Sequence, residues 1–279
     1  MEAAQSLRAR YQSLRATLED NVFDAPLYIE SQDSQGRING AIFGVVYHNI
    51  DALRAMVTSP PGWCEMLLLH PNIKYCAHRP STKNGEVLLT IYAGSKNYVA
   101  MRDARRSEYT VRVTENTHDY LVANVSADTG PLDTSEYRLV LEAVALDKDS
   151  TFVHVGFSYR YGAMTRALTA TYFSTLGRNK VGFSIVGRDN QGQPIFVRGR
   201  TASLERTVMR TYLALQTWLE GRSKPDAERF EWRLKRWYFL TERYPKQLYE
   251  FDEKDYLDIK RREHASVSGA PADAVPPKG

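Results

Sequence analysis

Residues 203–220 of the chain read SLERTVMRTYLALQTWLE, and this stretch decides the fold. Apolar side chains recur in it every three or four positions, which is the period of an amphipathic helix. Ser203 is a typical N-cap residue and Gly221 a typical stop, so the pattern predicts one long helix between them. The apolar stripe of this helix needs a large surface to cover it, and it consists of Leu204, Val208, Tyr212, Leu215, Trp218 and Leu219.

A series of strand-like runs before this helix supplies that surface. Tyr109, Val111 and Val113 alternate with polar residues, and a period of two is typical of a strand with one buried face. The short polar link 147–150 predicts an antiparallel hairpin between its flanking runs. The sequence therefore predicts an α+β protein with an antiparallel sheet, whose main strands are 73–77, 86–93, 108–114, 120–127, 136–146 and 151–161.

Shorter elements surround these strands. One more strand is predicted over 38–48, where Gly40 and Gly44 mark places at which it bends or is closely approached. Residues 21–35 mix turn residues with short apolar pairs and predict an extended arm. The other segments predict a hairpin over 181–198, helices over 5–20, 50–57, 63–69, 164–176, 227–244 and 252–263, and a disordered tail over 265–279.

Composition excludes several classes of protein. Of 279 residues, 43% are hydrophobic, and 17 Tyr, 10 Phe and 4 Trp are typical of a globular chain. The 37 Lys and Arg side chains are interleaved with 33 Asp and Glu, and the net charge of +4 predicts no nucleic-acid partner. No apolar run approaches the roughly 20 residues of a membrane-spanning helix, and Met1 is not followed by a signal-peptide pattern. We therefore expect a soluble chain without a transmembrane segment.

The predicted elements follow one order: a strand, a helical pair, a run of antiparallel strands and one long amphipathic helix. Over residues 38–220 this order resembles the helix-grip fold of the START-like (SRPBCC) superfamily. The resemblance implies a curved sheet around the long helix and, between them, an apolar cavity for a lipid, a sterol or another hydrophobic small molecule. We expect a core over 36–221, preceded by a helix and arm (1–35) and followed by a helical extension (222–264). Elements without a fixed counterpart in that superfamily are 164–176, 181–198 and the two C-terminal helices.

Two short segments carry a second resemblance. Residues 63–76, WCEMLLLHPNIKYC, and 241–245, TERYP, are similar to segments of uncharacterised proteobacterial proteins that carry an export signal. This resemblance implies a mature periplasmic protein whose signal has been removed. The alternative is a cytoplasmic protein.

Cys64 and Cys76 are the only two cysteines. A disulfide between them closes a short loop, stabilises the fold by about 3 kcal/mol and persists only in an oxidising compartment. Zinc binding together with His70 and His78 is an alternative, but the closely spaced ligand pairs of structural zinc sites are absent. Cys64 as a nucleophile with His70 as its base lacks an orienting third group. The disulfide is the favoured interpretation, and no metal is predicted.

Two groups of polar residues are candidates for contact with a ligand. His154 lies on the polar face of one hairpin strand, and Arg138 and Glu142 lie on the matching face of its partner. This face either lines the cavity and orients an apolar ligand, or faces water as a cross-strand charged cluster. Arg206 and Arg210 are one helical turn apart and either hold a carboxylate or phosphate head group or form a solvated helix face.

Large aromatic side chains are the natural walls of a cavity in this fold. We expect non-enzymatic binding or transport of a hydrophobic, lipid-like small molecule, without a cofactor. One alternative is a cyclase or hydrolase in which His154, Glu142 or Arg138 performs acid and base work. Another is an interaction module whose helices over 227–263 dock a protein partner, self-associate or associate with a membrane. The aromatic candidates for the cavity wall are Trp63, Tyr92, Tyr159, Tyr161 and Tyr212.

Overall fold

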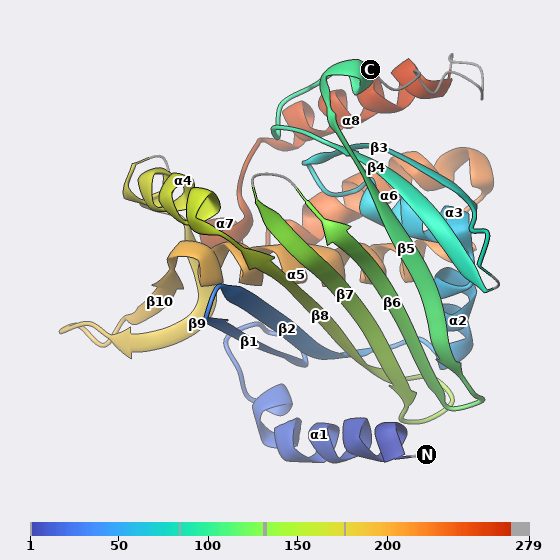
Figure 1. Ribbon diagram of the computed structural model, residues 1–279. Helices are drawn as coiled ribbons and strands as arrows, with labels where there is room; N and C mark the ends of the chain where they lie inside the picture. Colours follow the sequence, from blue (N-terminus) through green and yellow to red (C-terminus); the bar gives the residue numbers. More distant parts are fainter. Residues whose placement is uncertain (1, 84, 131–132, 176, 269–279) are drawn as a thin grey trace.

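A computed structural model describes residues 2–83, 85–130, 133–175 and 177–268. Its centre is a curved eight-stranded sheet in the order β1-β2-β8-β7-β6-β5-β4-β3 (Figure 1). Every neighbouring pair of strands is antiparallel, so the predicted fold class is confirmed. The strands are β1 (Leu27–Ser34), β2 (Arg37–Val46), β3 (Ile73–Pro80), β4 (Glu86–Ala93), β5 (Arg105–Asn116), β6 (Tyr120–Thr129), β7 (Thr134–Ala145) and β8 (Thr151–Tyr161).

Helices pack on both faces of this sheet. The long helix α5 (Gly199–Glu220) crosses the face that we call the inner face, and α1 (Glu2–Glu19) packs against the opposite, outer face (Figure 1). The helical pair α2 (Ile50–Val57) and α3 (Pro60–Leu67) connects β2 to β3 across the sheet. The expected order of a strand, two helices, antiparallel strands and a long helix is therefore confirmed.

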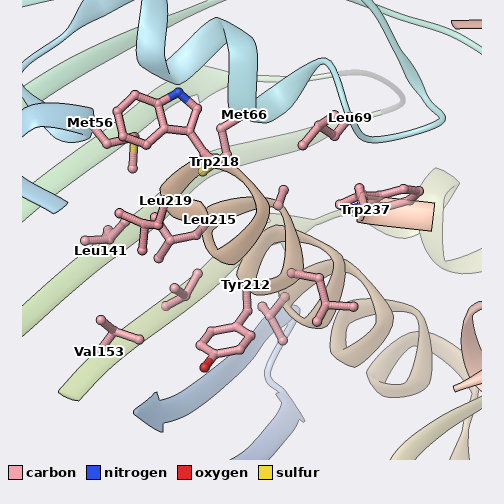
Figure 2. Packing of buried hydrophobic residues seen from close by; sticks show 14 of the residues in the cluster. Met56, Met66, Leu69, Leu141, Val153, Tyr212, Leu215, Trp218, Leu219 and Trp237 are labelled. Atoms are coloured by element: carbon pink, nitrogen blue, oxygen red, sulfur yellow. The ribbon is translucent and has the colours of Figure 1, made fainter. Parts of the chain in front are cut away.

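The alternation of side chains decides what faces α5. On β8, Val153 and Val155 point inward, and Leu141 of β7 lies beside them in register with Val155. All three are at most 1% exposed, and they share one core with Tyr212 and Leu215 of α5 (Figure 2). Burial of each such side chain stabilises the fold by about 1.5–3 kcal/mol.

Two glycines of β2 let α5 lie close to the sheet. A Cβ on Gly40 would stand 2.9 Å from two side-chain carbons of Leu204, and one on Gly44 would stand 2.8 Å from the hydroxyl of Tyr212. Contacts this short are not tolerated by real Cβ atoms. The predicted close approach at these glycines is therefore confirmed, and the element that approaches is the long helix.

The start of α5 differs from the prediction. The helix begins at Gly199, one turn before Ser203, and no side chain in the described part of the chain caps it. Buried Glu205 anchors this end instead: its carboxylate accepts the backbone N–H groups of Phe183 and Ser184 in β9 (Val181–Arg188). The apolar period begins only at Leu204, so the pattern could not predict the helical turn before it.

The segment predicted as an arm over 21–35 is in part a strand. β1 pairs with β2 along its whole length, from Leu27 opposite Gly44 to Ser34 opposite Arg37. Only Leu27 and Ile29 of β1 are buried apolar residues, so the strand period was too short to recognise. The sheet therefore has one more edge strand than the sequence predicted.

The C-terminal helices belong to the same core as the sheet. Trp237 of α6 (Asp226–Thr241) stacks on Tyr256 of α8 (Glu253–Ser268) with ring centroids 5.2 Å apart. Glu263 of α8 accepts two buried ammonium groups, those of Lys74 on β3 and Lys260, each at 2.8 Å. Removing one member of such a group would leave an uncompensated buried charge, so α8 is firmly attached to the sheet edge.

Two predicted ends also need correction. The helix predicted over 227–244 is α6, which ends at Thr241, and a short helix that was not predicted, α7 (Pro245–Leu248), follows it. Helix α8 continues to Ser268, so residues 265–268 of the predicted tail are helical, and 269–279 lie outside the described residues. Within the described ranges, no helix combines the length and the apolar character needed to cross a membrane.

The two cysteines form the predicted disulfide. Cys64 of α3 and Cys76 of β3 are bonded, with their Cα atoms 5.3 Å apart. The bond joins the helical pair to the far edge of the sheet, and neither sulfur remains as a thiolate for zinc or for nucleophilic attack. The cysteine prediction is therefore confirmed in its favoured form.

Candidate functional site

A cavity of about 210 Å³ lies between α5, α3 and the inner face of the sheet. Apolar and aromatic side chains make most of its wall. Its sheet side comes from strands β3 to β8, and the main contributors are Ile91, Tyr109, Val125, Tyr137, Leu139 and Phe157. A cavity with apolar walls and a few polar groups is the usual form of a small-molecule site.

The sequence of α5 explains why space remains here. Thr207, Thr211 and Ala214 line the cavity, and their spacing places them on one face of the helix. These side chains are short, whereas Leu215 and Leu219 fill the neighbouring part of the interface (Figure 2). Small residues on one helix face therefore hold the helix near the sheet without filling the gap.

Polar groups gather at one end of the cavity. His70, Asn72 and Arg210 all line it. Burial lowers the pKa of His70 well below its ordinary value, and the charges of Arg210, Lys260 and Lys96 lower it further. His70 is therefore neutral, and because its Nδ1 accepts the backbone N–H of Asn72 at 3.2 Å, its proton is on Nε2. This end of the cavity offers hydrogen-bond donors.

Arg210 belongs to a buried charge cluster centred on Glu250. Its Nη2 lies 2.8 Å from the Glu250 carboxylate, which also accepts Lys96 at 2.5 Å and Lys180 at 3.0 Å. Burial raises the pKa of Glu250, but the three cations outweigh burial and lower the pKa to about 2. Three positive charges therefore surround one negative charge, and the cavity end is electropositive.

Two arginines of α5, Arg206 and Arg210, retain unused donors. Arg206 and Arg210 are 4% and 5% exposed, and their Nε atoms have no hydrogen-bond partner among the described residues. Arg206 lies beside the carbonyl of Val181 rather than on the cavity wall. Neither arginine lies on a solvated helix face, which was one of the two interpretations from the sequence.

The aromatic candidates fall in three places. Trp63 lines the cavity, and its indole N–H donates to the Val57 carbonyl at 2.9 Å. Tyr212 is buried between α5 and β2, with its hydroxyl 3.3 Å from the Val45 carbonyl. The others lie outside the cavity wall: Tyr92 packs on Tyr75, Tyr159 stacks on Tyr137, and Tyr161 donates to Asp33.

His154, Glu142 and Arg138 lie on the outer face of the sheet. The His154 ring stacks on Phe43 at 4.5 Å, and its Nδ1 is 3.3 Å from Glu142. Burial raises the pKa of Glu142, but hydrogen bonds from His154 and Tyr120 outweigh it and lower the pKa. Arg138 and His154 border an open groove of about 650 Å³, and the sheet separates this groove from the apolar cavity.

These observations decide the architecture. A curved antiparallel sheet wraps one long helix and leaves an apolar cavity between the two. The chain has the helix-grip architecture. This agrees with the expected likeness to the START-like superfamily at the level of architecture.

Comparisons with known proteins match this chain only to solved structures of low sequence identity and low TM-score. No protein-family model and no curated protein sequence matches the chain. Among solved structures, human StAR-related lipid transfer protein 5 is 14% identical with a TM-score of 0.39, covering 78% of this chain and 97% of its own. The ZhuI aromatase/cyclase from Streptomyces sp. R1128 is 11% identical with a TM-score of 0.39, covering 72% and 98%. A STAR-related lipid transfer protein fragment from Xanthomonas axonopodis is 13% identical with a TM-score of 0.38, covering 56% and 92%.

Sequence reasoning missed much of the polar end. His70 was considered only for metal binding and catalysis, and Asn72, Lys96 and Glu250 were not considered. Glu250 lies in the appended segment after α7, so no local pattern connects it with Arg210. Tyr109 was recognised as a buried strand residue, and only the register of the sheet brings it to the cavity.

Proposed function

We propose that the chain binds a small apolar molecule with one polar, hydrogen-bond-accepting end and releases it unchanged. The observation that supports this proposal is the apolar cavity that ends at Arg210 and His70. The apolar part of the molecule would replace water along Leu139 and Phe157. Its polar end would accept hydrogen bonds from the Arg210 guanidinium and from Nε2 of His70. The bond from the guanidinium would be charge-assisted and therefore the stronger of the two.

Two alternatives have less support. An acid and base role for His154 and Glu142 on a cavity ligand would require both side chains to reach through the sheet, because they lie on its outer face. Docking through the C-terminal helices would need an exposed apolar face. Leu234, Trp237 and Leu240 of α6 are at most 3% exposed, and Phe239, at 55%, is the one large apolar side chain of this fully described helix that is exposed.

We also propose that the chain works in an oxidising compartment such as a periplasm. The Cys64–Cys76 disulfide supports this location, because a reducing cytosol does not maintain such bonds. A thiol assay on unreduced protein taken from the cell of origin tests the proposal. The expected result is no free thiol in the folded protein or after denaturation, and two free thiols would contradict it.

Filling the cavity tests the binding proposal. In the double variant Thr211→Leu/Ala214→Leu, longer side chains enter the cavity. The affinity for a fluorescent fatty-acid probe should therefore fall at least tenfold. The matched control is Ala16→Leu/Thr17→Leu, which makes the same two changes at exposed positions of α1. A wild-type protein that takes up no apolar probe and yields no small molecule on solvent extraction would contradict the proposal.

A further inference from the structure

Helix α4 (Ala163–Ser174) is barely attached to the rest of the protein. Of its twelve residues, all within the described part of the chain, only Thr165 is buried. Asp133 accepts the backbone N–H groups of Met164 and Thr165 and so fixes the first turn. A helix this short is marginal in water unless one face packs against something. The structure therefore leaves an apolar helix face uncovered.

That face is a stripe of large apolar side chains. Met164, Leu168 and Tyr172 follow one another at four-residue steps and are 55%, 49% and 38% exposed. The hairpin of β9 and β10 (Pro194–Arg198) adds Val186 and Ile195, which are 63% and 43% exposed. Figure 1 shows α4 and this hairpin projecting from the same end of the molecule, where α5 begins. Five of the large exposed apolar side chains therefore gather at one end.

The charge of the chain is concentrated in the same segment. Residues 160–200 contain seven Arg or Lys and a single acidic residue, Asp189, so they carry +6 of a chain whose total is +4. The rest of the chain is therefore at −2. The expectation of charges interleaved throughout the sequence is wrong for this segment.

Four of these cations have no ion pair within the described residues. Arg166 lies over the Tyr161 ring, Arg188 donates to the Gly192 carbonyl, and Arg198 donates to the Arg178 carbonyl. Arg178 itself accepts through its backbone, and its guanidinium is exposed. Unpaired cations beside exposed apolar side chains match a surface that is anionic and apolar at once.

We propose that α4 and the β9–β10 hairpin dock the protein on a lipid bilayer that carries anionic head groups. Met164, Leu168 and Tyr172 would enter the interface between head groups and acyl chains, while Arg166 and Arg178 would contact phosphates. An acidic protein would satisfy the cations and leave the apolar stripe less well matched. The docked end also holds the start of α5, whose Thr207 lines the cavity, so docking would bring the cavity close to lipid.

Vesicle sedimentation of the full chain tests this proposal. The wild type should bind vesicles of phosphatidylcholine mixed with phosphatidylglycerol, bind pure phosphatidylcholine weakly, and dissociate as salt rises. The variant Arg166→Gln/Arg178→Gln should bind roughly 30-fold more weakly, because each cation near such a surface contributes about a fivefold factor. The matched control is Arg102→Gln/Lys148→Gln, which removes the same charge from two exposed side chains elsewhere.

A second pair of variants tests the apolar stripe. Met164→Ser/Leu168→Ser should lower binding to the anionic vesicles about tenfold or more, because two apolar side chains no longer leave water. Val22→Ser/Phe239→Ser, at positions 62% and 55% exposed, should not. Circular dichroism confirms folding of each variant. Absence of wild-type binding, equal losses in a variant and its control, or a wild-type dimer that the stripe variant breaks would each overturn the proposal.

Discussion

The inner and outer faces of the sheet are made by the same strands, but they differ in what they enclose. On β8, Val155 and Phe157 face α5 and the apolar cavity, while Phe152 packs against α1 and His154 lies on the same outer face. The inner face ends in an electropositive cluster with unused donors. On the outer face, the polar groups bond to one another: Tyr120 donates to Glu142, which in turn lies against His154.

The difference teaches that polar residues on a strand do not by themselves mark a binding site. An enclosed space is also needed. Here α5 covers the inner face of the sheet, and its short side chains leave a cavity between the two. The outer groove is larger, at about 650 Å³ against about 210 Å³, but it is more open and its lining is more polar.

The largest difference is expected between the carboxylates of Glu250 and Glu142, whose side chains are 9% and 21% exposed. Glu250→Gln should lower the free energy of unfolding by about 3–5 kcal/mol, because it leaves three cations without their common anion. Glu142→Gln should cost about 1 kcal/mol, since its amide still accepts from Tyr120. Urea denaturation of both variants at neutral pH measures the difference. Equal losses of stability in the two variants would contradict the proposed difference between the two faces.

The same carboxylate predicts a pH dependence. The pKa of Glu250 is lowered from 4.5 to about 2 in the folded protein. Its contribution to stability is therefore fully present above about pH 4.5 and is lost as the pH falls toward 2. Denaturation curves at several pH values should show wild-type stability falling in this window more steeply than that of Glu250→Gln. Parallel curves would contradict this assignment.

The disulfide between α3 and β3 should contribute to the stability of the fold. Cys64→Ala/Cys76→Ala should lower the free energy of unfolding by about 3 kcal/mol, because a loop of this length is no longer closed in the unfolded chain. Adding a reductant to the wild type should give the same loss. A reductant effect that persists in the double variant would show that the loss does not come from this bond.

A smaller effect is expected at the polar end of the cavity. Arg210→Gln should weaken binding of a fatty-acid probe by about 2 kcal/mol, and binding of the matching fatty alcohol by much less, because only the carboxylate of the acid forms an ion pair with the guanidinium. Comparing the two probes on one folded variant separates recognition from stability. Equal weakening of both would indicate only a structural role for Arg210.

The smallest effect is expected on the outer face. His154→Ala should leave probe affinity unchanged within about twofold and cost about 1 kcal/mol of stability, through the lost stacking on Phe43 and the lost contact with Glu142. Isothermal titration with the same probes is the measurement. A large loss of affinity in the folded variant would show that the ligand binds at the outer face, which contradicts our proposal.

Much of the fold could be predicted from local patterns. The apolar period of 203–220 identified α5, and alternation identified six strands of the sheet. β1 was missed because only Leu27 and Ile29 carry the period. The start of α5 was missed because Glu205 fixes it through β9 rather than through a local cap.

The candidate site could be predicted only in part. Arg210 and Trp63 were named, and both line the cavity. The choice of face for His154 could not be made, because alternation gives two faces without saying which one α5 covers. Glu250 is 40 residues from Arg210, so only the fold brings them together. The charge of 160–200 was available in the sequence, and counting by segment rather than over the whole chain would have found it.

The most direct test of the central claim is a crystal structure of the protein with a saturating fatty-acid probe. Our account predicts electron density between α5 and the inner face of the sheet, along Leu139 and Phe157, with the carboxylate within hydrogen-bond distance of Arg210. Density only in the outer groove beside His154, or a cavity that stays empty at saturation, would contradict it.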